Sequence, residues 1–217
     1  VVPANGENRH YPGGPFFDRQ YTLVLQELDD RVNRRVASGG EFDMAGFEPN
    51  YFFVNGLSYP HTTTDADTLI SMNVGDRVAL RFINAGLITN PMHFHGYHVE
   101  VVSRDRRPET VVVKKDTVPV GVGECVDVIL NCTQPGAYPL HTHYVPGVTA
   151  NGVYVNPVGG ARIGMRAAGS KHERVDMMHG NPHSPGMTRR SGRRMHGGGS
   201  GGEWSTGGGR SVSVLGA

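Results

Sequence analysis

The chain has 217 residues, a formal net charge of +1 and 37% hydrophobic residues, which is enough for one large or two small domains with a buried core. Its two cysteines, Cys125 and Cys132, exclude a scaffold that is held together by several disulfides. No apolar run approaches the ~20 residues of a membrane span, and the sequence contains neither a nucleophile–base arrangement nor a phosphate-binding loop.

The apolar residues at the start of the chain follow no helical or strand periodicity. Residues 1–20 contain Pro3, Pro12, Pro15 and two adjacent glycines, so we predict a linker or the end of a preceding domain. Residue 1 is Val rather than Met, and no charged segment leads into an apolar one. We therefore interpret the chain as a fragment or a processed form.

Short strands follow. Residues 21–28 are rich in strand-forming side chains, and residues 51–56 are predicted to form a short strand that ends in an Asn-Gly turn. Further strands are predicted at residues 68–73, 77–84, 93–102, 110–120, 126–131, 140–144 and 152–155. About eight or nine short strands with turn signals between them, and no convincing amphipathic helix, predict an all-β Greek-key sandwich or barrel.

Two of the predicted strands carry a His-x-His motif, His93-Phe94-His95 and His141-Thr142-His143. Side chains alternate between the two faces of a strand, so the two histidines of each motif point the same way. If the two strands are neighbours, four imidazoles meet in one small region. Imidazole is the commonest metal ligand in proteins and suits copper, zinc, iron and nickel. We predict a metal site formed by His93, His95, His141 and His143.

The other histidines and tyrosines nearby receive plainer interpretations. His98 has the wrong spacing from His95 and should face away, so a structural or supporting role is favoured over a ligand role. His10 and His61 lie in predicted loops and are expected on the surface. Tyr97 and Tyr144 flank the motifs and are expected to pack in the core.

The composition changes near residue 159. Residues 161–217 hold nine lysines and arginines against three acidic residues, a charge of +6, which leaves −5 for the first 160 residues. The same segment holds fourteen glycines and too few apolar residues to offset the entropy of folding. We predict a disordered Gly/Arg/Met/His-rich tail over residues 159–217.

Five of the eight methionines and four of the eleven histidines lie in this predicted tail. Their thioether and imidazole groups suit copper loading. A solvated basic segment in which these residues occur by chance is the favoured interpretation. No aromatic platform for stacked bases accompanies the arginines, so we expect no specific nucleic-acid partner.

The motifs follow one another in an order that resembles a known domain. The resemblance rests on Asn55-Gly56, Tyr59-Pro60, Val74-Gly75-Asp76, the two His-x-His motifs with residues 91–96 and 135–143 around them, Val122-Gly123-Glu124 and Gly152-Val153. Over about residues 20–157, the chain resembles a cupredoxin-like (plastocyanin-like) domain of the multicopper oxidases. The resemblance implies a cupredoxin-like sandwich over residues 21–158.

The resemblance also implies a function. In that family, His-x-His motifs from two cupredoxin domains hold a three-copper cluster that reduces dioxygen to water. The resemblance implies that His93 faces the type 2 copper, while His95, His141 and His143 face the type 3 pair. A copper-dependent oxidoreductase in the periplasm or outside the cell is expected, with a small molecule or a metal ion as the reductant.

The chain departs from the family where a type 1 copper would be bound. Domains that hold this copper have histidines at the positions of Asn90 and Gly147 and a cysteine at the position of Thr142. A type 1 site needs a thiolate with two imidazoles. We therefore expect no type 1 copper here. The type 1 site and the other cluster ligands are expected from a second cupredoxin domain of the same polypeptide, a partner chain or a homo-oligomer.

Two alternatives remain at the level of sequence. The chain could be a cupredoxin-fold copper-binding or structural module without turnover. It could also be a cupin, because Glu100 follows His93-x-His95 at a spacing that mimics a cupin motif. One metal ion would then take His93, His95, Glu100 and a later histidine such as His141.

Overall fold

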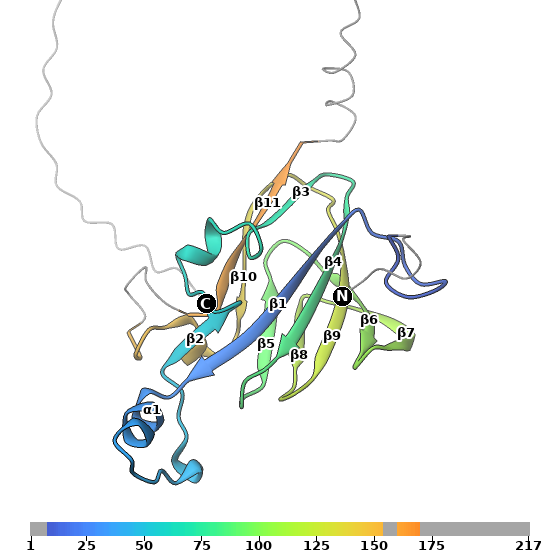
Figure 1. Ribbon diagram of the computed structural model, residues 1–217. Coiled ribbons are helices and arrows are strands. Elements are labelled where there is room, and N and C mark those ends of the chain that lie inside the picture. The colour runs from blue at the N-terminus through green and yellow to red at the C-terminus, as the bar shows by residue number, and fades with distance from the viewer. Residues whose placement is uncertain (1–7, 154–159, 170–217) are drawn as a thin grey trace, which may run out of the picture. The chain divides into compact units, whose positions relative to one another are not determined.

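Alternating apolar residues build two sheets that pack face to face in the computed structural model, which describes residues 8–153 and 160–169 (Figure 1). The six-stranded sheet has the order β2 (Tyr51–Val54), β1 (Arg19–Leu28), β4 (Arg77–Asn84), β9 (Cys125–Asn131), β6 (Val99–Arg104) and β7 (Arg107–Lys115). The five-stranded sheet has the order β3 (Ile70–Asn73), β11 (Arg162–Ala168), β10 (Gly136–Thr142), β5 (Asn90–Phe94) and β8 (Thr117–Val120). The predicted all-β sandwich is confirmed.

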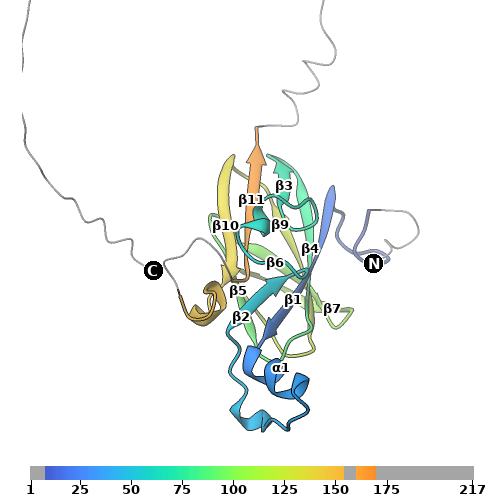
Figure 2. The same cartoon turned by 60° about the vertical axis from the view of Figure 1, so that its left-hand side comes forward.

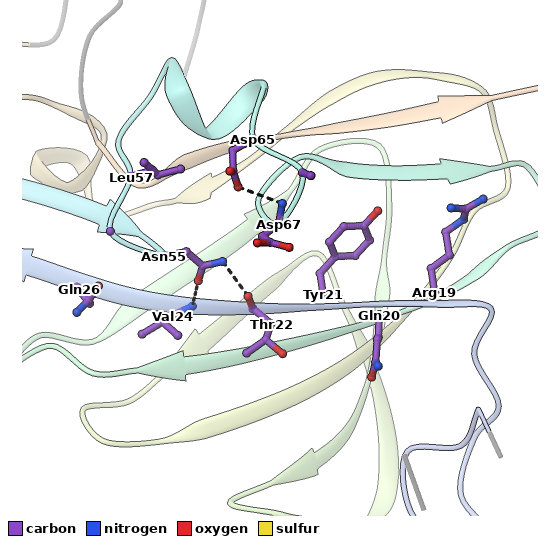
Figure 3. A pocket seen from close by; sticks show the side chains of 12 residues that line it. Arg19, Gln20, Tyr21, Thr22, Val24, Gln26, Asn55, Leu57, Asp65 and Asp67 are labelled. Atoms are coloured by element: carbon purple, nitrogen blue, oxygen red, sulfur yellow. Dashed lines mark hydrogen bonds between the residues drawn. The ribbon is translucent and has the colours of Figure 1, made fainter. Parts of the chain in front are cut away.

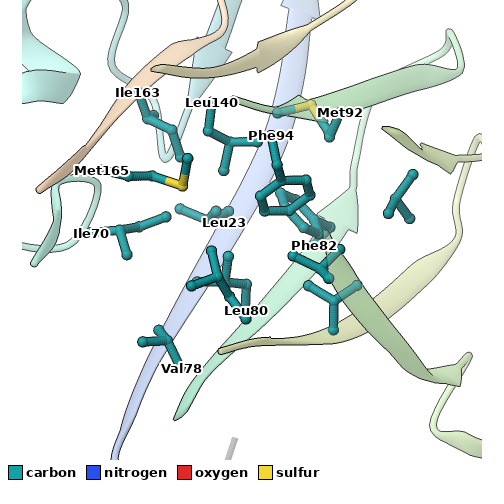
Figure 4. Close-up of a cluster of buried hydrophobic side chains, with 14 of the residues drawn as sticks. Leu23, Ile70, Val78, Leu80, Phe82, Met92, Phe94, Leu140, Ile163 and Met165 are labelled. Carbon is teal, nitrogen blue, oxygen red and sulfur yellow. The ribbon is translucent and has the colours of Figure 1, made fainter. Parts of the chain in front are cut away.

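The core lies between the two sheets (Figure 4). On β4, the predicted alternation places the side chains of Val78, Leu80 and Phe82 in this core, where each is fully buried. Phe94 reaches the same core from β5 and packs edge-on against Phe82, with ring centroids 6.0 Å apart. Burial of this kind is the main favourable contribution to the stability of the sandwich.

The N-terminal segment belongs to the sandwich in the part that the structure describes. Phe17 is buried with Ala79, Val102 and Ile129, on the face of the six-stranded sheet opposite the main core. The His10 side chain is only 2% exposed, and its Nε2 lies 2.7 Å from Asp127 Oδ2. The prediction that His10 is a surface residue was wrong. Residues 8–18 are therefore not a free linker.

A helix occupies the polar stretch between the first two strands, where none was predicted. Helix α1 (Asp30–Ala37) begins at the cap residue Asp29, whose side chain accepts a hydrogen bond from the Arg31 N–H. Asp30 and Arg34 form an ion pair one turn apart, at 2.6 Å. No residue of α1 is buried, and the helix lies at one end of the sandwich, beyond β1 and β2 (Figure 2). Its two valines, Val32 and Val36, lie one turn apart, but eight residues are fewer than the window in which a helical period can be recognised.

Three short 3-10 helices complete the elements that the structure describes: η2 (Met44–Gly46), η3 (His61–Thr63) and η4 (Val145–Val148). No helix among the described residues is long and apolar enough to cross a membrane. Cys125 and Cys132 are both free.

Strand β11 corrects the predicted start of the tail. It pairs with β10, where Ile163 lies opposite Leu140 and Met165 lies opposite Tyr138. Its apolar residues Ile163, Met165 and Ala167 alternate and are buried. The prediction of a disordered tail was therefore wrong for the residues of β11. Their apolar alternation is short and lies among glycines, so it resembles a low-complexity segment. The rest of the predicted tail, residues 170–217, lies outside the described residues.

Candidate metal centre

The two His-x-His motifs lie on neighbouring strands of the five-stranded sheet. The antiparallel register of β5 and β10 places His93 directly opposite His141. The alternate residues Met92 and Phe94 of β5 point into the core, so His93 points to the opposite, outer face of the sheet. The backbone pairing continues past both strand ends, where the His95 N–H donates to Pro139 O at 3.2 Å and the His143 N–H donates to Pro91 O at 2.7 Å.

The four imidazoles form one cluster, which we call the His cluster (His93, His95, His141 and His143). The ring centroids of His93 lie 4.8 Å from His95, 5.8 Å from His141 and 5.3 Å from His143. The His141 ring lies 5.1 Å from His95 and 5.8 Å from His143. The structure thus brings together all four histidines of the predicted metal site.

Hydrogen bonds orient two of these rings. His93 Nδ1 lies 2.8 Å from Thr117 Oγ1, on the neighbouring strand β8. His141 Nδ1 lies 2.8 Å from the carbonyl oxygen of Thr142. A carbonyl can only accept, so His141 carries its proton on Nδ1 and keeps a lone pair on Nε2. That Nε2 lies 3.0 Å from Nε2 of His95.

The surroundings favour the neutral form of two of the rings. Burial lowers the pKa of His95 below its ordinary value of 6.5, and repulsion from His93, Arg162 and His143 lowers it further. Burial is also the main cause of the lowered pKa of His141, which the hydrogen bond to the Thr142 carbonyl partly offsets. A neutral imidazole is the form that binds a metal ion, so the cluster is prepared for binding at neutral pH.

Mild acid is therefore expected to destabilise the metal-free fold. Below about pH 6.5 the unfolded chain binds protons at His95 and His141 more readily than the folded chain, because folding lowers both pKa values. Stability should thus fall as the pH drops from about 6.5 through the lowered pKa values. Urea midpoints measured across this range should show the loss, and the slope should be smaller in His141→Gln. Equal slopes for both chains would contradict this expectation.

The donor set of the cluster suits copper, but its rings are not arranged around a single ion. Four imidazoles on one sheet face are ligands that copper accepts in either common oxidation state. Within the described residues, no three His, Cys, Asp or Glu side chains converge as the ligands of one metal would. Ligands from outside the described residues would have to complete each metal's coordination.

The positions of the type 1 ligands hold residues that provide neither a thiolate nor an imidazole. Asn90 and Thr142 are buried, and a Cβ placed on Gly147 would collide with Thr142 Cγ2. No side chain can therefore extend from position 147 unless Thr142 moves. Cys125 lies on β9 of the other sheet, and Cys132 follows the end of that strand.

The cupin interpretation was wrong, because Glu100 lies on the other sheet. Its strand, β6, belongs to the six-stranded sheet. The carboxylate of Glu100 lies 3.3 Å from Asn131 Nδ2, 3.6 Å from Lys114 Nζ and 3.7 Å from Arg77. These surface partners hold it away from the His cluster, so one metal ion cannot take His93, His95 and Glu100 together.

The neighbouring aromatic residues pack as predicted. Tyr97 is buried and its hydroxyl donates to Gln134 O at 2.6 Å. Tyr144 packs edge-on against Phe52, with ring centroids 6.0 Å apart. His98 is exposed.

Sequence reasoning missed two residues that act on the cluster, Thr117 and Arg162. Thr117 contacts His93, and the charge of Arg162 helps to lower the pKa of His95. Neither residue belongs to a motif. Only the pairing of β8 with β5 and of β11 with β10 brings them to the site.

A groove of about 1100 Å³ lies elsewhere, between β1 and residues 65–67 (Figure 3). None of the clustered histidines lines it. Asn55 covers part of the β1 edge there, because its side chain accepts from the Val24 N–H at 2.7 Å and donates to Thr22 O at 3.0 Å. The groove is therefore separate from the candidate metal centre.

Comparison with known proteins agrees with the predicted fold and family. The sequence model of the multicopper oxidases matches residues 35–157. The blue copper oxidase from Nitrosomonas europaea is 30% identical with a TM-score of 0.58, and the alignment covers 74% of this chain and 46% of that one. The multicopper oxidase mgLAC is 29% identical with a TM-score of 0.59, covering 68% of this chain and 43% of that one. No curated protein matches the chain.

A copper nitrite reductase from Nitrosomonas europaea shares the fold, with 19% identity, a TM-score of 0.52, and coverage of 71% of this chain and 50% of that one. The sandwich is thus a cupredoxin-like domain. The chain belongs to the multicopper oxidase family, a family of copper-dependent oxidoreductases. It spans less than half the length of the two oxidases, at 46% and 43%. The predicted family and fold are confirmed.

Proposed function

We propose that this chain supplies His93, His95, His141 and His143 to a type 2 and type 3 copper cluster. That cluster would reduce dioxygen to water while a substrate is oxidised at a type 1 site elsewhere. One observation carries the proposal: the four imidazoles meet on one sheet face, with ring centroids 4.8–5.8 Å apart. Membership of the multicopper oxidase family supports it.

Other residues of the chain hold and orient the four histidine side chains. Copper bound at the cluster supplies the electron-transfer chemistry of dioxygen reduction. Partial burial lowers the pKa of His95 and of His141, which favours their neutral form, and the Thr142 carbonyl holds the His141 ring with Nε2 available. The resemblance assigns His93 to the type 2 copper. Its ring contacts Thr117 on β8, the strand that lies on the other side of β5 from β10. The other three histidines would face the type 3 pair.

A second cupredoxin domain is proposed to complete the cluster. His95 and His143 are exposed, so a partner can approach them from the outer face of the sheet. The partner would come from the same polypeptide, a partner chain or another copy of this chain, and would provide the type 1 copper. Its reductant would be a small molecule or a metal ion. We propose a periplasmic or extracellular location, as is common in the family.

A copper-binding module without turnover is the second candidate. The observation that favours it is that Asn90, Thr142 and Gly147 occupy the positions of the type 1 ligands, so the described residues offer no site at which substrate electrons could enter. Such a module would bind copper through the same histidines and would consume no dioxygen in any assembly.

Copper loading of the whole chain tests the proposed function. After loading and desalting, we expect bound copper with the electron paramagnetic resonance signature of imidazole ligands and without the intense blue colour of a type 1 site. Dioxygen consumption should appear only when a type 1 domain of the family is added with a reductant. Copper binding without consumption in that mixture would favour the module. An intense blue colour of the chain alone, or no copper bound to this chain even when the type 1 domain is present, would contradict the proposal.

A further inference from the structure

We propose that Thr117 is a positioning residue for His93: its hydroxyl accepts the His93 Nδ1 proton and so directs Nε2 of that ring toward copper. The inference rests on the proposed function, because it concerns how one ligand of that cluster is oriented. It adds a role for a residue outside both His-x-His motifs.

The sheet brings the two residues together. In the antiparallel pairing of β5 with β8, Thr117 is the residue directly opposite His93. The distance from His93 Nδ1 to Thr117 Oγ1 is 2.8 Å, which is the length of a good hydrogen bond. Both residues are half-buried, so water competes less for the bond than it would on the surface. The contact fixes the direction in which the ring can point.

His93 and His141 differ in the group that contacts Nδ1, which is a hydroxyl for His93 and a carbonyl for His141. A ring that binds a metal through Nε2 carries a hydrogen on Nδ1, and that hydrogen needs an acceptor. The Thr142 carbonyl accepts at all times, so His141 holds this tautomer before any metal arrives. The Thr117 hydroxyl can donate or accept, so it remains a partner of His93 both before and after the metal binds.

Replacement of the hydroxyl tests this role. Thr117→Val keeps the shape of the side chain and removes the hydroxyl that accepts the proton, whereas Thr117→Ser keeps the hydroxyl. Loss of such a supporting hydrogen bond typically weakens metal binding about 10–100-fold. We expect this loss in Thr117→Val, measured as copper(I) affinity against a competing chelator, and recovery in Thr117→Ser. A purely structural role would lower the melting temperature without a selective loss of affinity.

Nuclear magnetic resonance provides a readout that is independent of affinity. With ¹⁵N-labelled histidine and copper(I), which is diamagnetic, long-range ¹H–¹⁵N spectra should show His93 protonated on Nδ1 and metal-bound at Nε2. Thr117→Val should alter the signals of His93. Thr142→Val should leave the tautomer of His141 unchanged, because the carbonyl that accepts its proton remains.

The outcomes separate this proposal from the one on which it rests. If the unsubstituted chain binds copper(I) and Thr117→Val binds it equally well, the role of Thr117 is overturned and the proposed function stands. A spectrum with His93 metal-bound through Nδ1 would overturn it as well, even if the valine variant does not fold. If the unsubstituted chain binds no copper(I) even when a type 1 domain of the family is added, the proposed function is overturned and this proposal with it.

Discussion

Replacement of His141 by alanine is expected to remove most of the copper that the chain retains after loading and desalting. The His141 ring lies beside all three other rings: its centroid is 5.1 Å from that of His95 and 5.8 Å from those of His93 and His143, and its Nε2 lies 3.0 Å from Nε2 of His95. Loss of a supporting partner already weakens metal sites about 10–100-fold, and loss of a ligand should exceed this. Copper per folded chain, measured by elemental analysis, checks the result.

The matched control is His98→Ala. His98 is an exposed histidine on the connection between β5 and β6, so the variant loses the same chemical group outside the His cluster. Both variants keep the four histidines and the methionines of residues 170–217, so any copper bound there cancels in the comparison. Equal copper content in the two variants would show that the retained copper is bound outside the cluster.

The pairing of His93 with His141 shows where sequence reasoning ends. Alternation along a strand predicts that the two histidines of each motif share a face, and it predicts the buried positions Val78, Leu80 and Phe82 of β4. It does not predict which strands are neighbours. The resemblance to a known family, rather than the local pattern, indicated that the two motifs meet, and the register of β5 against β10 establishes it.

The missed elements have a common physical cause, which is that their stabilising contacts are not periodic. Helix α1 buries no residue and depends on the cap at Asp29 and on the amide of Asn50, which donates to Asp30 Oδ1 at 3.0 Å. The N-terminal segment is held by Phe17 and by His10, whose partner Asp127 is more than a hundred residues away in the chain. Such contacts exist only once the sheets have formed.

The same limit applied to Thr117. Its place in a strand could be predicted, but its contact with His93 depends on the order β10-β5-β8 in the sheet. The cluster is therefore a product of the sheet: β5 and β10 supply the ligands, β8 supplies a hydrogen-bond partner, and the core beneath keeps the three strands in register. Truncation of a side chain in that core should therefore also weaken copper binding at the His cluster.

Phe82→Ala is expected to lower the free energy of unfolding by about 3–5 kcal/mol, the usual cost of truncating a buried phenylalanine. Phe82 is fully buried on β4, between β1 and β9. Its ring packs at 6.0 Å against Phe94, the residue between His93 and His95. The cavity would remove the support beneath that motif, so copper affinity should fall together with stability. Urea unfolding and chelator competition measure the two effects.

Val111→Ala is the control for the loss of an apolar side chain. Val111 is 70% exposed on the edge strand β7, so its truncation should change the free energy of unfolding by no more than about 0.5 kcal/mol and leave copper affinity unchanged. A Phe82→Ala variant as stable as Val111→Ala would contradict the position of Phe82 in the core. A destabilised variant with unchanged copper affinity would show that the His cluster is held by hydrogen bonds within its own sheet, independently of the packing beneath it.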